Sequence, residues 1–117
     1  MKVIIAGGRD FSDMDLLSRK CDRILRDIPP HEITIISGNA SGADTLGVQY
    51  AYDRKIKVEH YPANWYGVGK GAGEIRNIEM AKNADALIAF WDGKSRGTKH
   101  MIDTAVKRGL KFRVIKY

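Results

Sequence analysis

Short apolar runs alternate with longer amphipathic stretches along the whole chain. Five apolar runs are expected to form strands: Lys2–Ala6, Glu32–Ile36, Lys57–Tyr61, Ala86–Trp91 and Phe112–Lys116. Four stretches between them have helical spacing, one after Ser12 and the others near Gly42–Arg54, Gly73–Asn83 and Thr98–Arg108. Strict alternation of strands and helices is typical of a parallel sheet with right-handed crossovers and helices on both faces. The pattern therefore predicts a doubly wound, three-layer α/β/α fold.

Two hydroxyl residues and one long connection refine this outline. Ser12 followed by Asp15 resembles a capping box, so we expect the first helix to start at Ser12. Thr98 is expected to cap the last helix. The connection Pro62–Ala72 is long for a compact domain, and glycine recurs there at every second position from Gly67. We interpret it as a loop that covers a ligand, with an unordered surface excursion as the alternative.

Length and composition indicate a single globular domain over residues 1–117. The chain has 117 residues, 44% of them hydrophobic, which suits one core. No apolar run reaches the length of a membrane span and no leader sequence is recognisable, so a cytoplasmic protein is expected. Cys21 falls in an apolar helical stripe and is expected in the core. The three histidines lie far apart, and no metal site is predicted.

The net charge of +6 favours an anionic partner. Lysine and arginine are spread along the chain, and no tract of five or more basic residues occurs. Charge alone therefore leaves a small nucleotide and a nucleic acid both open.

The loops at the carboxyl ends of the expected strands carry the candidate chemistry. A glycine-rich bend, Ser37–Asp44, joins a strand to a helix in the manner of a backbone cradle for phosphate. The first strand ends in Gly7 and Gly8, followed by Arg9, whose guanidinium suits bidentate binding of phosphate. The alternative for Arg9 is an ion pair with Asp10 or Asp13 that only orders the turn.

Two further segments add to this edge of the sheet. The fourth strand runs into Asp92–Thr98, where Gly97 and Thr98 open a helix and offer amides and a hydroxyl to an anion. In the long connection, Trp65 is the better candidate for stacking on a base, ahead of Tyr66 and Trp91. Lys70, Arg76 and Asn77 are expected to close over a phosphate.

Standard motifs of nucleotide enzymes are absent. The segment before Gly69 and Lys70 has Asn64 where a Walker A loop needs glycine. No dinucleotide fingerprint follows the first strand, and the second strand ends in Ser37 instead of a ribose-binding acid. Neither a Ser/His/Asp arrangement nor a catalytic carboxylate pair can be assigned.

Taken together, the ordered motifs resemble the YspA-like branch of the SLOG superfamily. These motifs are Gly7–Phe11, Ser37–Gly38 with Gly42–Asp44, Pro62–Trp65, Gly69–Lys70 with Arg76–Asn77, and Asp92–Thr98. The resemblance implies a Rossmann-like fold with strand order 3-2-1-4-5 and a nucleotide or nucleotide-derived ligand. The wider superfamily includes the DNA-processing protein DprA and the LOG phosphoribohydrolases.

The chain departs from the superfamily pattern in two loops. Asn39 stands where the branch usually has glycine, and Ser41 stands where it usually has arginine, so a phosphate-binding charge is missing from this loop. The LOG hydrolases have a glutamate three residues after the Gly-Thr pair, and the matching residue here is Met101. Methionine cannot act as an acid or base or stabilise an oxocarbenium ion.

We therefore expect a module that binds or senses a nucleotide or nucleotide derivative such as ADP-ribose or NAD. The residues expected to form the site are Gly7, Gly8, Arg9, Ser37, Gly38, Asn39, Ser41, Gly42, Asp44, Trp65, Lys70, Arg76, Asn77, Asp92, Ser95, Arg96, Gly97 and Thr98. The alternative is an N-glycosidic hydrolase of nucleoside monophosphates, with Asp10, Asp44, Glu74 or Asp92 as its acid. Binding of single-stranded DNA is a third, less favoured interpretation. The sequence leaves the oligomeric state open, a homo-oligomer included.

Overall fold

A five-stranded parallel sheet forms the centre of the protein. The computed structural model describes residues 1–117, and the strands lie in the order β3-β2-β1-β4-β5. Their bounds are β1 Lys2–Gly7, β2 Thr34–Ser37, β3 Lys57–His60, β4 Ala86–Trp91 and β5 Lys111–Lys116. Strands β2 and β3 are added on one side of β1, and β4 and β5 on the other, so the strand order reverses between β1 and β4. These two strands pair in parallel, from Val3 with Ala86 to Gly7 with Phe90. The fold class and strand order expected from the sequence are confirmed.

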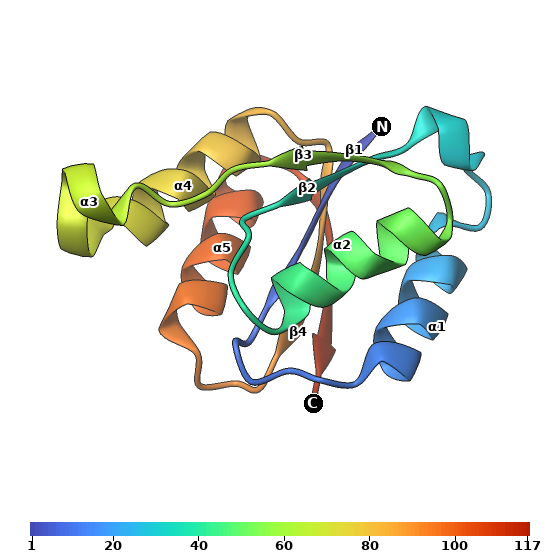
Figure 1. The fold of residues 1–117 in the computed structure, drawn as a ribbon, viewed down its shortest axis with the longest axis horizontal. Coiled ribbons are helices and arrows are strands. Elements are labelled where there is room, and N and C mark those ends of the chain that lie inside the picture. Colours follow the sequence, from blue (N-terminus) through green and yellow to red (C-terminus); the bar gives the residue numbers. More distant parts are fainter.

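Helices cover both faces of this sheet (Figure 1). On one face lie α1 (Met14–Leu25) and α2 (Ala43–Asp53), and on the other lie α4 (Ala72–Lys82) and α5 (Arg96–Lys107). Helices α1 and α5 are strongly amphipathic, because each has a face that packs on the sheet and a charged face in water. The predicted three-layer α/β/α arrangement is therefore the observed one.

Each face of the sheet has its own apolar core. The core under α1 and α2 contains Ile5, Leu17, Cys21 and Phe90, and all four side chains are almost completely buried. The core under α4 and α5 is smaller and includes Met80 and Met101. Since β1 and β4 contribute to both cores, they are buried on both sides, as expected for central strands of a parallel sheet.

Two predicted helix starts are wrong by a short distance. Helix α1 is capped by Asp13, whose carboxylate accepts a hydrogen bond from the Leu16 amide at 2.9 Å. The expected cap was Ser12, but Asp13 is an equally good capping residue and lies one position nearer the apolar stripe. Helix α5 is capped by Ser95 instead of Thr98, because Ser95 accepts from the Thr98 amide.

The segment Pro62–Ala72 contains more structure than the expected loop. Residues Trp65–Val68 form the short helix α3, and Gly69–Gly71 form a 3-10 turn that runs directly into α4. Asn64 caps α3 by accepting from the Gly67 amide at 2.9 Å. Figure 1 shows α3 projecting from the body of the molecule beyond the start of α4. A further 3-10 turn, Pro30–Glu32, precedes β2, so the predicted strand start at Glu32 is also corrected.

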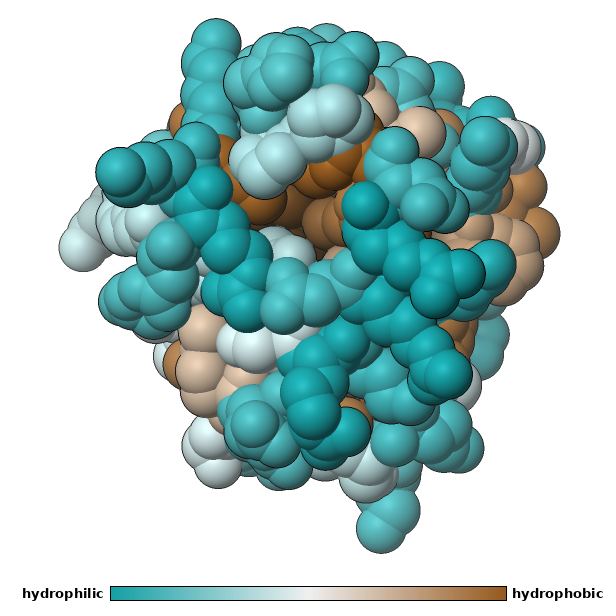
Figure 2. Space-filling model, turned by 90° about the vertical axis from the view of Figure 1, so that its right-hand side faces the viewer, coloured by the Kyte–Doolittle hydropathy of each residue, from teal (hydrophilic) through white to brown (hydrophobic).

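The surface is mostly hydrophilic. Figure 2 shows the side that lies at the right of Figure 1, where hydrophilic side chains surround a small hollow that exposes apolar ones. None of the helices combines the length and hydropathy needed to traverse a lipid bilayer.

Candidate functional site

A cleft lies at the carboxyl ends of the strands, where the strand order reverses between β1 and β4. Ligands bind at this position in open α/β sheets, because the two loops leave the sheet in opposite directions and open a crevice. The cleft has a volume of about 450 Å³. Its lining comes from the β1–α1 loop, the start of α2, the α3–α4 segment and the β4–α5 loop. The sequence motifs therefore meet at one edge of the sheet.

The β1–α1 loop delivers Arg9 to the cleft. Gly7 and Gly8 lie so close to other groups that a side chain at Gly7 would collide with the Phe90 carbonyl, and one at Gly8 with the Tyr117 hydroxyl. Arg9 is exposed, takes part in no hydrogen bond or salt bridge, and lies with its guanidinium carbon 6.0 Å from the centre of the Trp65 ring. The guanidinium is therefore free to bind a ligand.

The alternative role for Arg9, an ion pair that orders the turn, is not observed. Asp10 instead accepts a hydrogen bond from the Tyr117 hydroxyl at 2.8 Å, and Asp13 caps α1. Both neighbouring carboxylates are thus engaged elsewhere.

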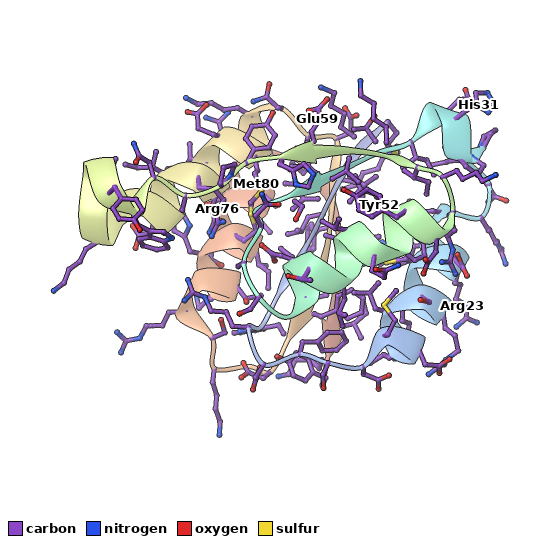
Figure 3. The ribbon with its side chains drawn as sticks, in the orientation of Figure 1. Arg23, His31, Tyr52, Glu59, Arg76 and Met80 are labelled. Carbon is purple, nitrogen blue, oxygen red and sulfur yellow. The ribbon has the colours of Figure 1, made fainter.

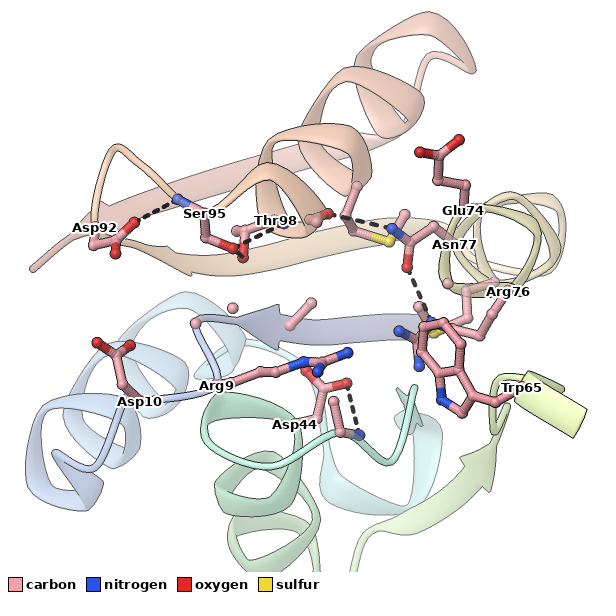
Figure 4. Close-up of a pocket in the computed structure, with 18 of the residues that line it drawn as sticks. Arg9, Asp10, Asp44, Trp65, Glu74, Arg76, Asn77, Asp92, Ser95 and Thr98 are labelled. Atoms are coloured by element: carbon pink, nitrogen blue, oxygen red, sulfur yellow. Dashed lines mark hydrogen bonds between the residues drawn. The ribbon is translucent and has the colours of Figure 1, made fainter. Parts of the chain in front are cut away.

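Arg76 reaches the same cleft from α4 (Figures 3 and 4). Its guanidinium donates to the Gly38 carbonyl and to Asn77 Oδ1, the latter at 3.1 Å. Burial lowers the pKa of Arg76, Asp44 opposes this shift, and the nearby charge of Arg9 lowers the pKa further. Arg76 forms no salt bridge, so two guanidinium groups face one cleft without a directly paired carboxylate. A positive charge from α4 therefore lies at the cleft, although the loop after β2 has serine at position 41.

The loop Ser37–Gly42 uses several of its amides internally. The Asn39 amide donates to Ser37 Oγ at 3.2 Å, and the Ala40 amide donates to Asp44 Oδ2 at 3.3 Å. The Ala43 amide, at the start of α2, donates to the Gly8 carbonyl at 3.1 Å. The loop was expected to bind phosphate through its backbone amides, but one of these amides, that of Ala40, already donates to the Asp44 carboxylate.

Asp44 is the most perturbed acid of the cleft. It is 5% exposed, and burial raises its pKa to about 6, although the Ala40 and Gly7 amides and the two arginines act in the opposite direction. Its position, near Arg76 and beneath the Arg9 side chain, makes it both an internal anion and a group that titrates near neutrality.

The start of α5 forms the opposite wall of the cleft. Asp92 accepts from the amides of Lys94 and Ser95, each at 2.8 Å, and these hydrogen bonds lower its pKa. Ser95 caps the helix and contacts the buried Thr98 hydroxyl at 3.0 Å. The amides of Arg96 and Gly97 have no hydrogen-bond partner in the structure. This helix start therefore retains free donors.

The two ends of the cleft differ in the charges they carry (Figure 4). Asp10 and Asp92 lie at one end, whereas Arg9, Arg76 and the indole of Trp65 gather toward the other, where the carboxylates of Asp44 and Glu74 also lie. Neither Asp10 nor Asp92 is in a salt bridge, and each retains an oxygen that accepts no hydrogen bond. The cleft thus suits a ligand with anionic groups at one end and hydrogen-bond donors at the other.

A second hollow of about 320 Å³ adjoins the cleft. It shares Arg9, Trp65 and Arg76 with the cleft and continues along the β2–α2 loop toward Pro62 and Ala63. Asn39 borders it with a left-handed φ of 61°, and its side chain contacts His60 Nδ1 at 2.6 Å. The arginine pair therefore lies between two connected volumes.

The structure brings most of the predicted site residues together. Those lining the cleft are Gly7, Gly8, Arg9, Asp44, Trp65, Lys70, Arg76, Asn77, Asp92, Ser95, Gly97 and Thr98. Gly38, Asn39 and Ser41 line the second hollow. Ser37, Gly42 and Arg96 line neither; Ser37 is buried, a Cβ at Gly42 would collide with the Gly8 carbonyl, and Arg96 is exposed.

Several lining residues were absent from the predicted site. Ala6, Ala40, Gly73 and Met80 line the cleft, as do Asp10 and Glu74, which had been considered only as acids. Met80 follows Arg76 by one helical turn, so helical periodicity was a signal that could have placed it. Met101 also lines the cleft, although its side chain is almost completely buried. No group of three or more His, Cys, Asp or Glu side chains is arranged to hold a metal ion.

Sequence comparison assigns the chain to a family. Residues 1–66 match the family described as "YspA, cpYpsA-related SLOG family". The gene 61 protein of Mycobacterium phage D29 is 33% identical over 116 residues, which cover 93% of this chain and 91% of the phage protein. The chain belongs to this SLOG family. The resemblance inferred from the five motifs is thereby confirmed.

Two solved structures of DNA processing protein A share the SLOG fold of this chain. The protein from Streptococcus pneumoniae superposes with a TM-score of 0.76 at 18% identity, over 99% of this chain and 50% of that one. The Helicobacter pylori protein, whose structure is described as revealing its single-stranded DNA binding mode, gives 0.71 at 20% identity over 97% and 64%. The chain thus spans half to about two thirds of these proteins, and at such identities the likeness establishes the fold.

Proposed function

We propose that the cleft binds a nucleotide-derived ligand through phosphate groups held between Arg9 and Arg76. The observation that carries this proposal is the approach of two guanidinium groups without a salt-bridged carboxylate. Asp44 lies near both arginines but forms a salt bridge with neither, so a phosphate between them can make charge-assisted, bidentate contacts with both guanidinium groups. The free amides at the start of α5 add donors on the opposite wall.

The remaining groups suit the other parts of such a ligand. The indole of Trp65, 47% exposed beside Arg9, offers a surface for a base or a sugar ring. The unused oxygens of Asp10 and Asp92 can accept hydrogen bonds from ribose hydroxyls. Because the arginines lie between two volumes of about 450 and 320 Å³, a ligand with two arms joined by phosphates, such as ADP-ribose, fits better than a nucleoside monophosphate.

Titration calorimetry of the purified protein tests the proposal. AMP, ADP, ADP-ribose and NAD are titrated into the wild type, Arg9→Ala and Arg96→Ala. Arg96 is a matched control, since it is exposed and lines neither hollow. We expect ADP-ribose to bind more tightly than AMP and Arg9→Ala to weaken binding about tenfold or more, with Arg96→Ala unchanged. Absence of binding by all four ligands at millimolar concentration would refute the proposal.

Hydrolysis of an N-glycosidic bond is a second candidate, favoured by one observation. Asp44 lines the cleft with a pKa of about 6, which is suitable for a general acid near neutral pH. Against it, Met101 lies in the cleft where the related hydrolases have glutamate. Release of free base from AMP that disappears in Asp44→Asn would support this candidate, whereas binding without release would leave recognition as the function.

Binding of single-stranded DNA is a third candidate, based on what is described for the Helicobacter pylori structure. It predicts affinity for oligonucleotides of many sequences that falls steeply as salt rises, because phosphate contacts release counterions. Weak binding that does not change with salt would argue against it.

A further inference from the structure

The edge strand β5 carries an unusual combination of side chains. Phe112 is 43% exposed and Val114 is 36% exposed, although apolar side chains in this sheet are otherwise mostly buried. Lys111 and Arg113 alternate with them, and neither forms a salt bridge. Lys116 lies on the same face as Phe112 and Val114, with its ammonium 5.4 Å from the centre of the Trp91 ring. The strand order places β5 at the edge of the sheet, and Figure 1 shows it, in red, ending at the C-terminus. Exposed apolar residues on an edge strand mark a surface that can pair with another strand.

The register separates these side chains onto two faces. Phe112 and Val114 pair with Leu87 and Ala89 of β4, which belong to the core under α4 and α5. Arg113 pairs with Ile88, which belongs to the opposite core. Because neighbours in register point to the same face, Phe112 and Val114 lie on the α5 side, whereas Lys111 and Arg113 lie on the α1 side.

The outer amides of β5 are open, whereas one outer carbonyl, that of Phe112, accepts a hydrogen bond from Arg113. The amides of Lys111 and Tyr117 donate to carbonyls at the two ends of β4, those of Asp85 and Trp91. Since successive residues of a strand direct their amides to opposite sides, the amides of Phe112, Val114 and Lys116 point away from the sheet. The Arg113 side chain contacts the Phe112 carbonyl at 3.3 Å, which agrees with that carbonyl facing outward.

We propose that β5 is a docking edge for an extended polypeptide segment in which acidic and apolar residues alternate. Such a segment adds a sixth strand, with its acidic side chains beside Lys111 and Arg113 and its apolar ones beside Phe112 and Val114. A second copy of this chain is disfavoured, because pairing of two β5 strands brings three cationic side chains from each copy to one seam without a carboxylate. This proposal is independent of the ligand in the cleft.

Fluorescence anisotropy with two labelled peptides tests the proposal. In one short peptide Glu and Val alternate; in the other the same residues stand in two blocks. We expect the alternating peptide to bind about tenfold more tightly, because only its pattern matches both faces of β5. Equal binding of the two peptides, or binding of neither, would overturn the proposal.

Substitutions at Val114 distinguish strand pairing from charge attraction. Val114→Pro removes an outward amide and leaves the hydrogen bonds to β4 intact, as edge strands allow, whereas Val114→Thr keeps the amide. We expect Val114→Pro to weaken the alternating peptide about tenfold and Val114→Thr to leave it within about twofold. An unchanged affinity in Val114→Pro would contradict strand addition.

A charge exchange provides the second variant if Val114→Pro does not fold, as judged by circular dichroism. The double substitution Lys111→Glu and Arg113→Glu is expected to lose the Glu/Val peptide and to bind a Lys/Val peptide instead. A single-stranded thymidine oligonucleotide serves as the competing macromolecule. If the oligonucleotide displaces the peptide and Val114→Pro binds it normally, the basic edge is a nucleic-acid surface and the proposal fails.

Discussion

The guanidinium of Arg76 donates to the carbonyl of Gly38 and so joins α4 to the loop after β2. Thirty-eight residues separate the two partners in the chain. Gly38 has no room for a side chain, since a Cβ would lie 2.5 Å from Arg76 Nη1 and 2.8 Å from Asp44 Oδ2. The glycine is therefore required by the arginine that lies against it.

Gly38→Ala is expected to impair binding more than stability. The methyl group displaces the flexible end of Arg76 from the cleft, which should lower the affinity for ADP-ribose about tenfold, with a loss of unfolding free energy near 1 kcal/mol. Calorimetry and urea unfolding measure the two quantities. Gly71→Ala is the control, because nothing lies within 4 Å of the added carbon there. Unchanged affinity in Gly38→Ala would show that Arg76 does not contact the ligand.

Asp44→Asn is expected to change how stability depends on pH. Burial raises the folded-state pKa of Asp44 from 3.8 to about 6, so the folded protein binds this proton more tightly than the unfolded chain does. As pH rises from about 4 through 6, the contribution of this group to the stability of the wild type is therefore lost. At pH 7 the loss amounts to about 3 kcal/mol of unfolding free energy. The amide side chain of the variant cannot ionise, so the variant should gain on the wild type as pH rises.

Urea unfolding of both proteins from pH 4 to pH 7 measures this difference. The difference between the two proteins isolates Asp44 from the other titrating groups. A constant difference across the range would mean that the Asp44 carboxyl titrates in the folded protein as it does in the unfolded chain.

Two glycine-to-alanine substitutions in helices should act in opposite directions. A Cβ at Gly47 of α2 would lie 2.7 Å from Ile5 Cγ2 in the buried strand β1, so Gly47→Ala forces the helix off the sheet. We expect a net loss of about 1–2 kcal/mol, since overpacking exceeds the gain in helix propensity. At Gly97 of α5 nothing lies within 4 Å, and Gly97→Ala should stabilise by about 0.5–1 kcal/mol. Urea unfolding gives both values; a stabilising Gly47→Ala would contradict the described packing of α2 on β1, and a destabilising Gly97→Ala would contradict the open space at the start of α5.

Cys21 should resist thiol reagents in the folded protein. Its side chain lies on the face of α1 that packs on the sheet and is completely buried, and this burial raises the pKa of the thiol to about 12. An aromatic disulfide reagent at pH 8 should therefore react only as fast as the chain opens, and the rate should rise with urea. Cys21→Ala, which has no thiol, measures the background reaction of the reagent. Rapid labelling without denaturant would mean that α1 separates readily from the sheet.

The sequence predicted the sheet well because the signal for a buried strand is local. The uninterrupted run of Ala86–Phe90 is typical of a central strand, and β4 occupies that place. Helix ends were less certain, since Ser12 and Asp13 are both capping residues and only the turn geometry chooses between them. The order 3-2-1-4-5 came from the family resemblance.

Most residues that line the cleft could be predicted from the sequence, but the hydrogen bonds among them could not. Arg9 and Arg76 were both expected near a phosphate, yet their approach depends on how β1 and α4 pack. The occupation of the Ser37–Gly42 loop by Asp44 was missed, because a glycine-rich bend looks the same whether its amides bind a ligand or a side chain. Helix α3 was missed as well, since glycine-rich sequence favours a loop and only the Asn64 cap marks a helix start.

Tyr117 gives the edge strand a connection to the cleft. Its hydroxyl donates to Asp10, and its ring packs edge-on against Phe11, with 4.8 Å between ring centres. When the last residues of β5 fray, Asp10 loses the donor that fixes its carboxylate in the acidic end of the cleft. The position of a carboxylate in the cleft therefore depends on the order of the last residue of the described chain, which lies next to the outermost strand.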